Sequence, residues 1–161
     1  HTEEALFRLT EAYLRLGVDG DWEIVGTDIS TRVLETARRA LYPVEAAERI
    51  PNALLRKYCL RGRDEYEGYL AISQGLTSHA TFRHANLIQL PDDLGMFDVV
   101  FLRNVMIYFN NETKAELVRH AEKLIKPGGY LFVSHSESIN GLGSSLKMVQ
   151  PSVYRAGGGD G

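Results

Sequence analysis

The sequence has little cysteine and no long apolar run, and both shortages restrict what the protein can be. Cys59 is the only cysteine, so an internal disulfide is impossible, and its apolar neighbours Tyr58 and Leu60 predict a packed thiol. The longest apolar runs are about five to six residues, against the roughly 20 needed to span a bilayer. The chain also opens without a charged leader and an apolar region behind it. We therefore expect no membrane insertion and a cytoplasmic location.

Blocks of positive charge are lacking as well. Lys and Arg total 18 against 21 Asp and Glu, which gives a net charge of -3. No basic cluster is long enough to follow a phosphate backbone, so no nucleic-acid partner is expected. With 44% hydrophobic residues in 161, the chain can build one sizeable core but not comfortably two.

Metal-binding and hydrolase patterns are missing too. The histidines His79, His84, His120 and His135 lack ligand spacing, and no Cys-x-x-Cys pair exists, so no metal site is predicted. The run Ser134 to Glu137 (SHSE) holds hydrolase residue types. However, a Gly-x-Ser-x-Gly turn is absent and adjacent residues do not form a triad. Hydrolysis is therefore not the expected reaction.

What the sequence does contain is an alternation of helices and buried strands, which is the pattern of an α/β fold. Helices are expected over 3–16, from a cap at Ser30 to Pro43 with Leu41 on its apolar face, and from a cap at Asn110 or Asn111. Strands are expected over 22–27, 97–102 and 130–134, with Pro127 to Gly129 stopping the helix before the last. Residues 146–149 and 152–155 form a predicted terminal antiparallel pair.

The stretch from 44 to 83 interrupts this rhythm. Pro51 can start a short helix through Tyr58, and Gly68–Ser73 and Thr77–Phe82 have strand character around a loop at Gly75. We predict that these two runs form a hairpin in a small inserted subdomain. The expected organisation is a main domain over 1–43 and 84–156, a helix-plus-hairpin β-subdomain over 44–83 and a flexible tail over 157–161.

Polar residues follow three strand-like runs. Asp28 ends the first, beside the crevice where open α/β sheets bind ligands, and its two oxygens can accept from two ribose hydroxyls. An aspartate that starts a helix fits equally, and nicotinamide nucleotides use the same contact. Asn86-Leu87 and Arg103-Asn104 end two more runs on the same rim, where Asn can pair with an adenine edge and Arg with a carboxylate. Together these endings predict a nucleoside-binding site.

At this point four segments resemble the CheR-type chemotaxis methyltransferases. They are WEIVGTDIS (22–30), FRHANL (82–87), FDVVFLRNVMIYFN (97–110) and KPGGYLFVSHSES (126–138). The similarity runs from about Glu3 to Arg155, and RNVMIYF is its most specific part. The resemblance implies a Rossmann-like class I methyltransferase sheet with helices on both faces, a terminal antiparallel hairpin and the inserted β-subdomain.

The same resemblance implies an enzyme that transfers a methyl group from S-adenosylmethionine to glutamates of chemotaxis receptors and leaves S-adenosylhomocysteine. Asp28 would hold the ribose, and Tyr108 would stand near the transferred methyl. The further cofactor contacts would be Asn86, Leu87, Arg103, Asn104 and, in a Gly-Glu-Glu run of the family, Glu3 or Glu4. Receptor tails would bind through the 68–82 hairpin. No general base is needed, because a glutamate carboxylate with a pKa near about 4.3 is already ionised at neutral pH.

The departures from the family pattern leave two alternatives open. Thr2 replaces the family glycine, Ala5-Leu6-Phe7 replaces Pro-Tyr-Ser, and the first strand, its glycine-rich loop and the amino-terminal helical domain are absent from the sequence. We therefore expect this chain alone to bind the cofactor poorly and to be weakly active or inactive. The alternatives are a non-catalytic adaptor that binds receptor tails and a nicotinamide-nucleotide module of the same fold.

Overall fold

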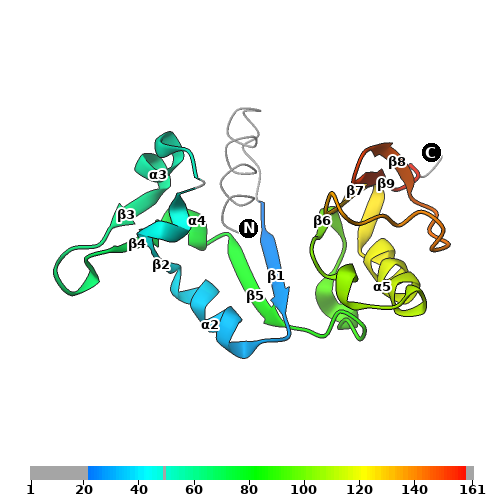
Figure 1. Ribbon diagram of the computed structural model, residues 1–161, viewed down its shortest axis with the longest axis horizontal. Coiled ribbons are helices and arrows are strands. Elements are labelled where there is room, and N and C mark those ends of the chain that lie inside the picture. Colours follow the sequence, from blue (N-terminus) through cyan, green and yellow to red (C-terminus); the bar gives the residue numbers. More distant parts are fainter. Residues whose placement is uncertain (1–21, 49, 159–161) are drawn as a thin grey trace. The chain divides into compact units, whose positions relative to one another are not determined.

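The computed structural model describes residues 22–48 and 50–158 (Figure 1). The predicted helix over 3–16 lies outside these residues. The chain divides into two compact units, residues 1–84 and 85–161, and each is described by itself. The strands are β1 (Ile24–Asp28), β2 (Leu41–Pro43), β3 (Cys59–Arg61), β4 (Tyr69–Ile72), β5 (Ala80–His84), β6 (Phe97–Leu102), β7 (Ile125–Val133), β8 (Lys147–Gln150) and β9 (Val153–Arg155). The helices are α2 (Thr31–Arg39), α3 (Asn52–Tyr58), α4 (Gln74–Thr77) and α5 (Asn111–Lys123), with 3-10 turns η1 (Val44–Ala47), η2 (Asp64–Tyr66), η3 (Asp92–Leu94) and η4 (Met106–Tyr108).

The first unit contains a parallel strand pair covered by a helix. β1 pairs with β5 in parallel, from Ile24 opposite Ala80 to Asp28 opposite His84. Helix α2 begins as predicted at Ser30, whose hydroxyl accepts from the backbone N–H of Val33 at 3.4 Å. The Arg38 guanidinium donates to the Phe82 carbonyl oxygen at 2.8 Å, so α2 is fastened to β5.

The predicted end of this helix was wrong. α2 ends at Arg39, because Ala40 takes the left-handed conformation with φ of 51° and reverses the chain. Leu41, expected on the apolar face of the helix, begins β2 instead and pairs with Ala71 of β4. The paired residues of that ladder lie 26 to 30 positions away in the chain, which a helical periodicity does not reveal.

The predicted hairpin between 68–73 and 77–82 was also wrong. β4 lies between β2 and β3 in an antiparallel sheet of order β2-β4-β3, so the hairpin that forms joins β3 to β4. The chain then makes a helical turn, α4, whose Leu76 is buried with Tyr58 in a small core. This turn directs residues 80–84 away from β4 and into the parallel pair with β1.

The second unit is a four-stranded sheet of order β6-β7-β9-β8. β6 and β7 are parallel, whereas β7, β9 and β8 are antiparallel neighbours, which confirms the predicted terminal pair. Helix α5 begins after Asn110, whose side-chain oxygen accepts from the N–H of Thr113 at 2.9 Å. It packs on the sheet through a core of side chains that are at most 8% exposed: Leu102, Met106, Leu117, Val118, Ala121, Ile125, Leu131, Val133, Ile139, Leu146 and Tyr154.

β7 is longer than the strand predicted over 130–134. β7 starts at Ile125 rather than at Tyr130, because residues 125–129 continue the strand with a register shift opposite β6 between Phe97 and Val99. In the described part of the chain, β1 has β5 as its one strand neighbour, and β6 has β7.

No helix within the described ranges is both long and apolar enough to traverse a bilayer.

Candidate functional site

Asp28 lies at the carboxyl end of β1 and is half-buried. Its Oδ1 accepts a hydrogen bond from the backbone N–H of Ser30 at 2.7 Å, which orients the carboxylate at the start of α2. This single bond leaves acceptor capacity on both oxygens, because an ionised carboxylate offers about four lone-pair sites. The aspartate therefore begins a helix and remains able to accept from ligand hydroxyls.

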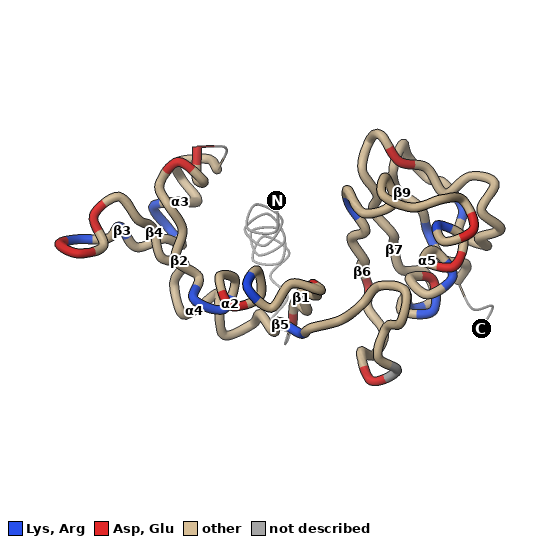
Figure 2. Tube along the Cα trace, turned by 60° about the horizontal axis from the view of Figure 1, so that its bottom comes forward, with Lys and Arg blue, Asp and Glu red and all other residues tan. Residues whose placement is uncertain are grey.

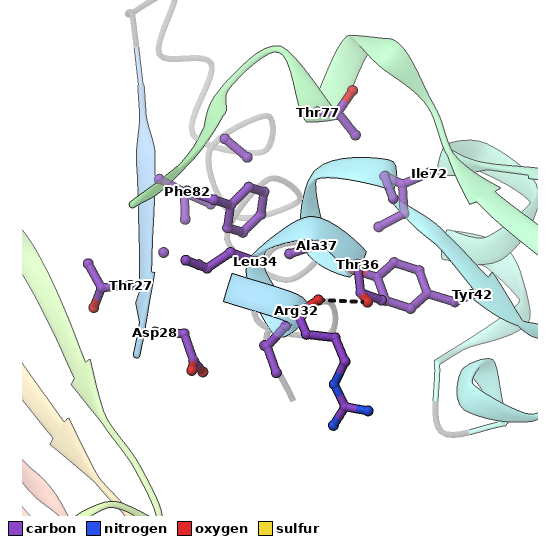
Figure 3. A pocket seen from close by; sticks show the side chains of 15 residues that line it. Thr27, Asp28, Arg32, Leu34, Thr36, Ala37, Tyr42, Ile72, Thr77 and Phe82 are labelled. Atoms are coloured by element: carbon purple, nitrogen blue, oxygen red, sulfur yellow. Dashed lines mark hydrogen bonds between the residues drawn. The ribbon is translucent and has the colours of Figure 1, made fainter. Parts of the chain in front are cut away.

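The same aspartate lines a cavity of about 430 Å³ that belongs to the first unit alone. Figure 3 shows Phe82 and Leu34 side by side between β1 and α2, with Asp28 and Arg32 toward one end. The rest of the wall is mostly apolar: Ile24, Gly26, Thr27, Val33, Thr36, Ala37, Ala40, Tyr42, Ile72, Thr77 and Ala80. A concave apolar surface with a carboxylate at its border is the usual form of a small-molecule site.

Asn86 and Leu87 lie at the start of the second unit. The side-chain oxygen of Asn86 accepts from the Ile88 N–H at 3.0 Å, and its carbonyl oxygen accepts from the Gln89 N–H at 3.0 Å. Asn86 thus closes a turn on itself and keeps its amide NH₂ group as a donor. Leu87 is half-buried against the core of the second unit, so its side chain has a packing role.

The residues after β6 form one loop that exposes the predicted site side chains. Arg103 and Asn104 are exposed, and Tyr108 is 78% exposed at the end of the 3-10 turn η4. Met106, between them, is only 1% exposed and belongs to the core. Met106 anchors the loop in the core, with Val105 and Phe109 half-buried beside it, whereas Arg103, Asn104 and Tyr108 face outward.

Ser134 and Glu137 hold this loop, and the sequence analysis missed them. Ser134 is 4% exposed and Glu137 8% exposed, and both contact the backbone of the loop after β6. Residues 134–137 lie in the family segment 126–138 and are weighed above for hydrolysis, but they receive no role in the predicted site. A usable signal existed, because Ser134 ends the predicted strand 130–134 and Glu137 follows it, so both lie on the same rim as the end of strand 97–102.

The structure brings part of the predicted site together. Arg103, Asn104 and Tyr108 share one loop of the second unit, while Asp28 belongs to the first unit. Glu3 and Glu4 lie outside the described residues. Over residues 22–48 and 50–158, no group of three or more His, Cys, Asp or Glu side chains is placed to hold a metal ion.

The sequence of the chain matches a known protein family. Residues 5–155 match the family model described as CheR methyltransferase, SAM binding domain. The chain is 35% identical over 136 residues to the chemotaxis protein methyltransferase of Salmonella typhimurium, covering 84% of this chain and 47% of that protein. The corresponding Escherichia coli protein is 36% identical over 136 residues, covering 84% and 48%. Chemotaxis protein methyltransferase 1 of Pseudomonas aeruginosa is 38% identical over 139 residues, covering 83% and 49%. The chain thus spans about half the length of these relatives.

Proposed function

Because the chain belongs to the CheR methyltransferase family, whose SAM-binding domain matches residues 5–155, we propose that it acts in the methylation of chemotaxis receptors. The fold is α/β and the cofactor is S-adenosylmethionine. The proposed reaction moves the methyl group to receptor glutamates, with receptors as partners. The single cysteine fits a reducing compartment, so the proposed location is the cytoplasm.

The residues of the first unit fit the cofactor. Asp28 retains acceptor sites for two ribose hydroxyls after its bond to Ser30, and this is the observation that carries the proposal. The apolar wall with Phe82 and Leu34 suits the flat adenine ring better than it suits a phosphate. We propose Asn86, Leu87, Arg103 and Asn104 as the contacts from the second unit, with Leu87 acting by packing and the others by polar groups.

The chemistry requires placement rather than proton transfer. When bound, S-adenosylmethionine would supply a methyl group attached to a positively charged sulfur. An ionised glutamate oxygen would form a bond to that methyl carbon as the carbon–sulfur bond breaks. The chain's task is to align the two reactants and exclude water, which is worth roughly 7–11 kcal/mol in well-oriented reactions. Tyr108 is suited to this task, because it presents an aromatic ring and a hydroxyl from an anchored loop.

We further propose that the insertion predicted over 44–83 is a receptor-binding subdomain. Its sheet also includes β2 (Leu41–Pro43), which was predicted to belong to the main domain, whereas β5 (Ala80–His84) leaves the insertion and pairs with β1. Its sheet has β3 as an edge strand, and Leu60 of that strand is 65% exposed. Tyr58 and Gly62 hydrogen-bond across to Ser73 and Tyr69. Because hydrogen-bonded pairs alternate along an antiparallel ladder, Cys59 and Arg61 direct their backbone groups away from β4. An extended receptor tail can add to that edge.

The loop between β3 and β4 bears on which receptor tails would fit. It carries both signs of charge close together, as the blue and red segments of Figure 2 show. The basic residue of the loop is Arg63, next to Arg61 at the end of β3, and the acidic ones are Asp64, Glu65 and Glu67. A labelled receptor carboxyl-terminal peptide tests this proposal, and no binding at high micromolar concentration would favour a tail-independent mode.

The main proposal is tested with the longest natural polypeptide that contains this sequence. Calorimetry compares S-adenosylhomocysteine with NAD, and transfer of a labelled methyl group to receptor fragments is followed in parallel. Binding of S-adenosylhomocysteine together with receptor labelling is expected. Preference for NAD would identify a nicotinamide module, and tail binding without labelling would identify an adaptor.

A further inference from the structure

Glu137 is a buried carboxylate to which the proposed chemistry assigns no role. Its side chain is 8% exposed, and its two oxygens accept three backbone N–H groups. Oε1 accepts from Met106 at 2.9 Å, and Oε2 accepts from Asn104 at 3.2 Å and from Ser134 at 3.1 Å. A carboxylate is costly to bury unless it is hydrogen-bonded in this way. Its retention inside the second unit therefore needs a structural or functional reason.

The loop conformation supplies the reason. Asn104 is left-handed with φ of 58°, and Val105 follows in the right-handed region with φ of -111° and ψ of -45°. Successive residues of opposite hand turn their N–H groups to one side and form a concave anion site. Here the anion is the side chain of Glu137, which receives the N–H groups of residues 104 and 106.

Ser134 also contacts Asn104, through two hydrogen bonds in opposite directions. Its hydroxyl accepts from the Asn104 N–H at 2.8 Å and donates to the Asn104 side-chain oxygen at 2.8 Å. The Glu137 N–H donates to the Ser134 carbonyl oxygen at 2.9 Å, so serine and glutamate form one turn at the end of β7. That turn holds Asn104 by its backbone and its side chain together.

We propose that Glu137 is the positioning residue of the β6–α5 loop. By fixing the N–H groups of Asn104 and Met106, it sets the direction in which Arg103, Asn104 and Tyr108 face the cofactor and the acceptor glutamate. The inference rests on the proposed function for what the loop contacts, whereas the positioning itself concerns only residues of this chain. The Glu137 side chain acts through the loop and is not itself in contact with the reacting atoms.

The test replaces Glu137 by glutamine in the longest natural polypeptide that contains this sequence. Glu137→Gln keeps the size and one acceptor oxygen, but it turns an NH₂ group toward at least one of the N–H donors. Amide hydrogen exchange measured by NMR is expected to speed up at least about tenfold at Asn104 and Met106. Exchange at Leu117 and Val118, which lie in the core of α5, is expected to stay unchanged. S-adenosylhomocysteine affinity is expected to fall about tenfold, and methyl transfer to fall with it.

Glu122→Gln is the matched control. Glu122 is also a loop-holding glutamate of the second unit, and it accepts from the Ser144 hydroxyl at 3.0 Å and from the N–H and hydroxyl of Ser145. The Glu122→Gln variant is expected to loosen only the loop around Ser144 and Ser145 and to leave ligand affinity unchanged. Equal losses of affinity in both variants would mean general destabilisation and would overturn the proposal.

The remaining outcomes are also decisive. Unchanged exchange at Asn104 and Met106 in Glu137→Gln would overturn the proposal, as would a loosened loop with full affinity and activity. If Glu137→Gln does not fold, Ser134→Ala removes the hydroxyl that pairs with Asn104, and the same two changes are expected at smaller size. If the unmodified protein binds no S-adenosylhomocysteine, the proposed function fails, while amide exchange still decides whether Glu137 positions the loop.

Discussion

The Oδ1 atom of Asp28 lies 2.7 Å from the backbone nitrogen of Ser30, so one carboxylate serves both the start of α2 and the rim of the cavity. Ser30 in turn caps the helix by accepting from Val33. The local contact orients the aspartate before any ligand arrives, which reduces the entropy lost on binding. The helix-start role of Asp28 and its proposed ligand-binding role can be separated, because only the proposed role needs the charge.

Asp28→Asn is expected to keep the helix start and to weaken the ligand site. Asparagine retains an oxygen that can accept from Ser30, but it loses the charged acceptor for ribose hydroxyls. Affinity for S-adenosylhomocysteine is expected to fall by roughly 1.5–3 kcal/mol, with little change in unfolding free energy. Asp28→Ala is expected to lose both the acceptor for the Ser30 N–H at the helix start and the acceptor for the ribose hydroxyls. Calorimetry and urea unfolding measure the two effects, and full affinity in Asp28→Asn would remove Asp28 from the site.

Tyr108→Phe is expected to slow methyl transfer at least about tenfold, or about 1.4 kcal/mol in the barrier, with cofactor affinity nearly unchanged. The aromatic ring remains, whereas the hydroxyl proposed to stand near the transferred methyl group is gone. The control is Tyr130→Phe, which removes a hydroxyl from a half-buried ring on β7, 5.6 Å beneath the Arg155 guanidinium. Steady-state kinetics with labelled methyl donor decide, and equal rates for the Tyr108 variant and the unmodified protein would exclude the hydroxyl from the reaction.

Gly129→Ala is expected to destabilise the second unit by about 1–3 kcal/mol. A Cβ there would lie 2.8 Å from the Asp98 carbonyl oxygen of β6, and that backbone is held in the β6–β7 ladder. Gly157→Ala is the control, since its added Cβ meets nothing within 4 Å. Denaturant unfolding compares the two variants. Equal unfolding free energies would show that β6 can move away without cost.

Cys59 is expected to react slowly with iodoacetamide in the folded protein. Burial raises the pKa of its thiol above the ordinary value of 9.0, because the thiolate is poorly solvated there. The Cys59 thiol ionises at lower pH in the unfolded chain than in the folded one. The stability contributed by the neutral thiol is therefore lost as pH rises above about 9. Mass spectrometry at pH 8 with and without urea measures the alkylation. Equal rates in the two states would contradict the burial effect.

Local patterns were sufficient for the elements whose partners lie nearby. The apolar run 97–102 became β6 with the predicted limits, and Asn110 caps α5 as its side chain and position suggested. The turn between β8 and β9 is short, so their antiparallel pairing was also accessible. The family could be recognised for the same reason, since its most specific segment, 103–109, is one continuous loop.

Non-local pairing was beyond the reach of these patterns. Thr77–Phe82 was expected beside Gly68–Ser73, but residues 80–84 pair with β1 more than 50 positions earlier in the chain. Both partners offer the same kind of β-forming side chains, and the choice between them depends on the α4 turn and the burial of Leu76. Local patterns in a single sequence do not show which of the two strands residues 80–84 will pair with.

The sequence by itself determined the α/β class, the limits of β6, the cap of α5 to within two asparagines, and Asp28, Arg103, Asn104 and Tyr108 as candidate residues. These follow from periodicity, capping chemistry and motif, which are properties of neighbouring residues. Only the tertiary structure decided that β4 lies between β2 and β3 and that Glu137 receives the N–H groups of Asn104 and Met106. The physical reason is that a buried carboxylate must find its donors wherever the fold brings them. Here those donors lie more than 30 positions earlier in the chain, at the end of the neighbouring strand.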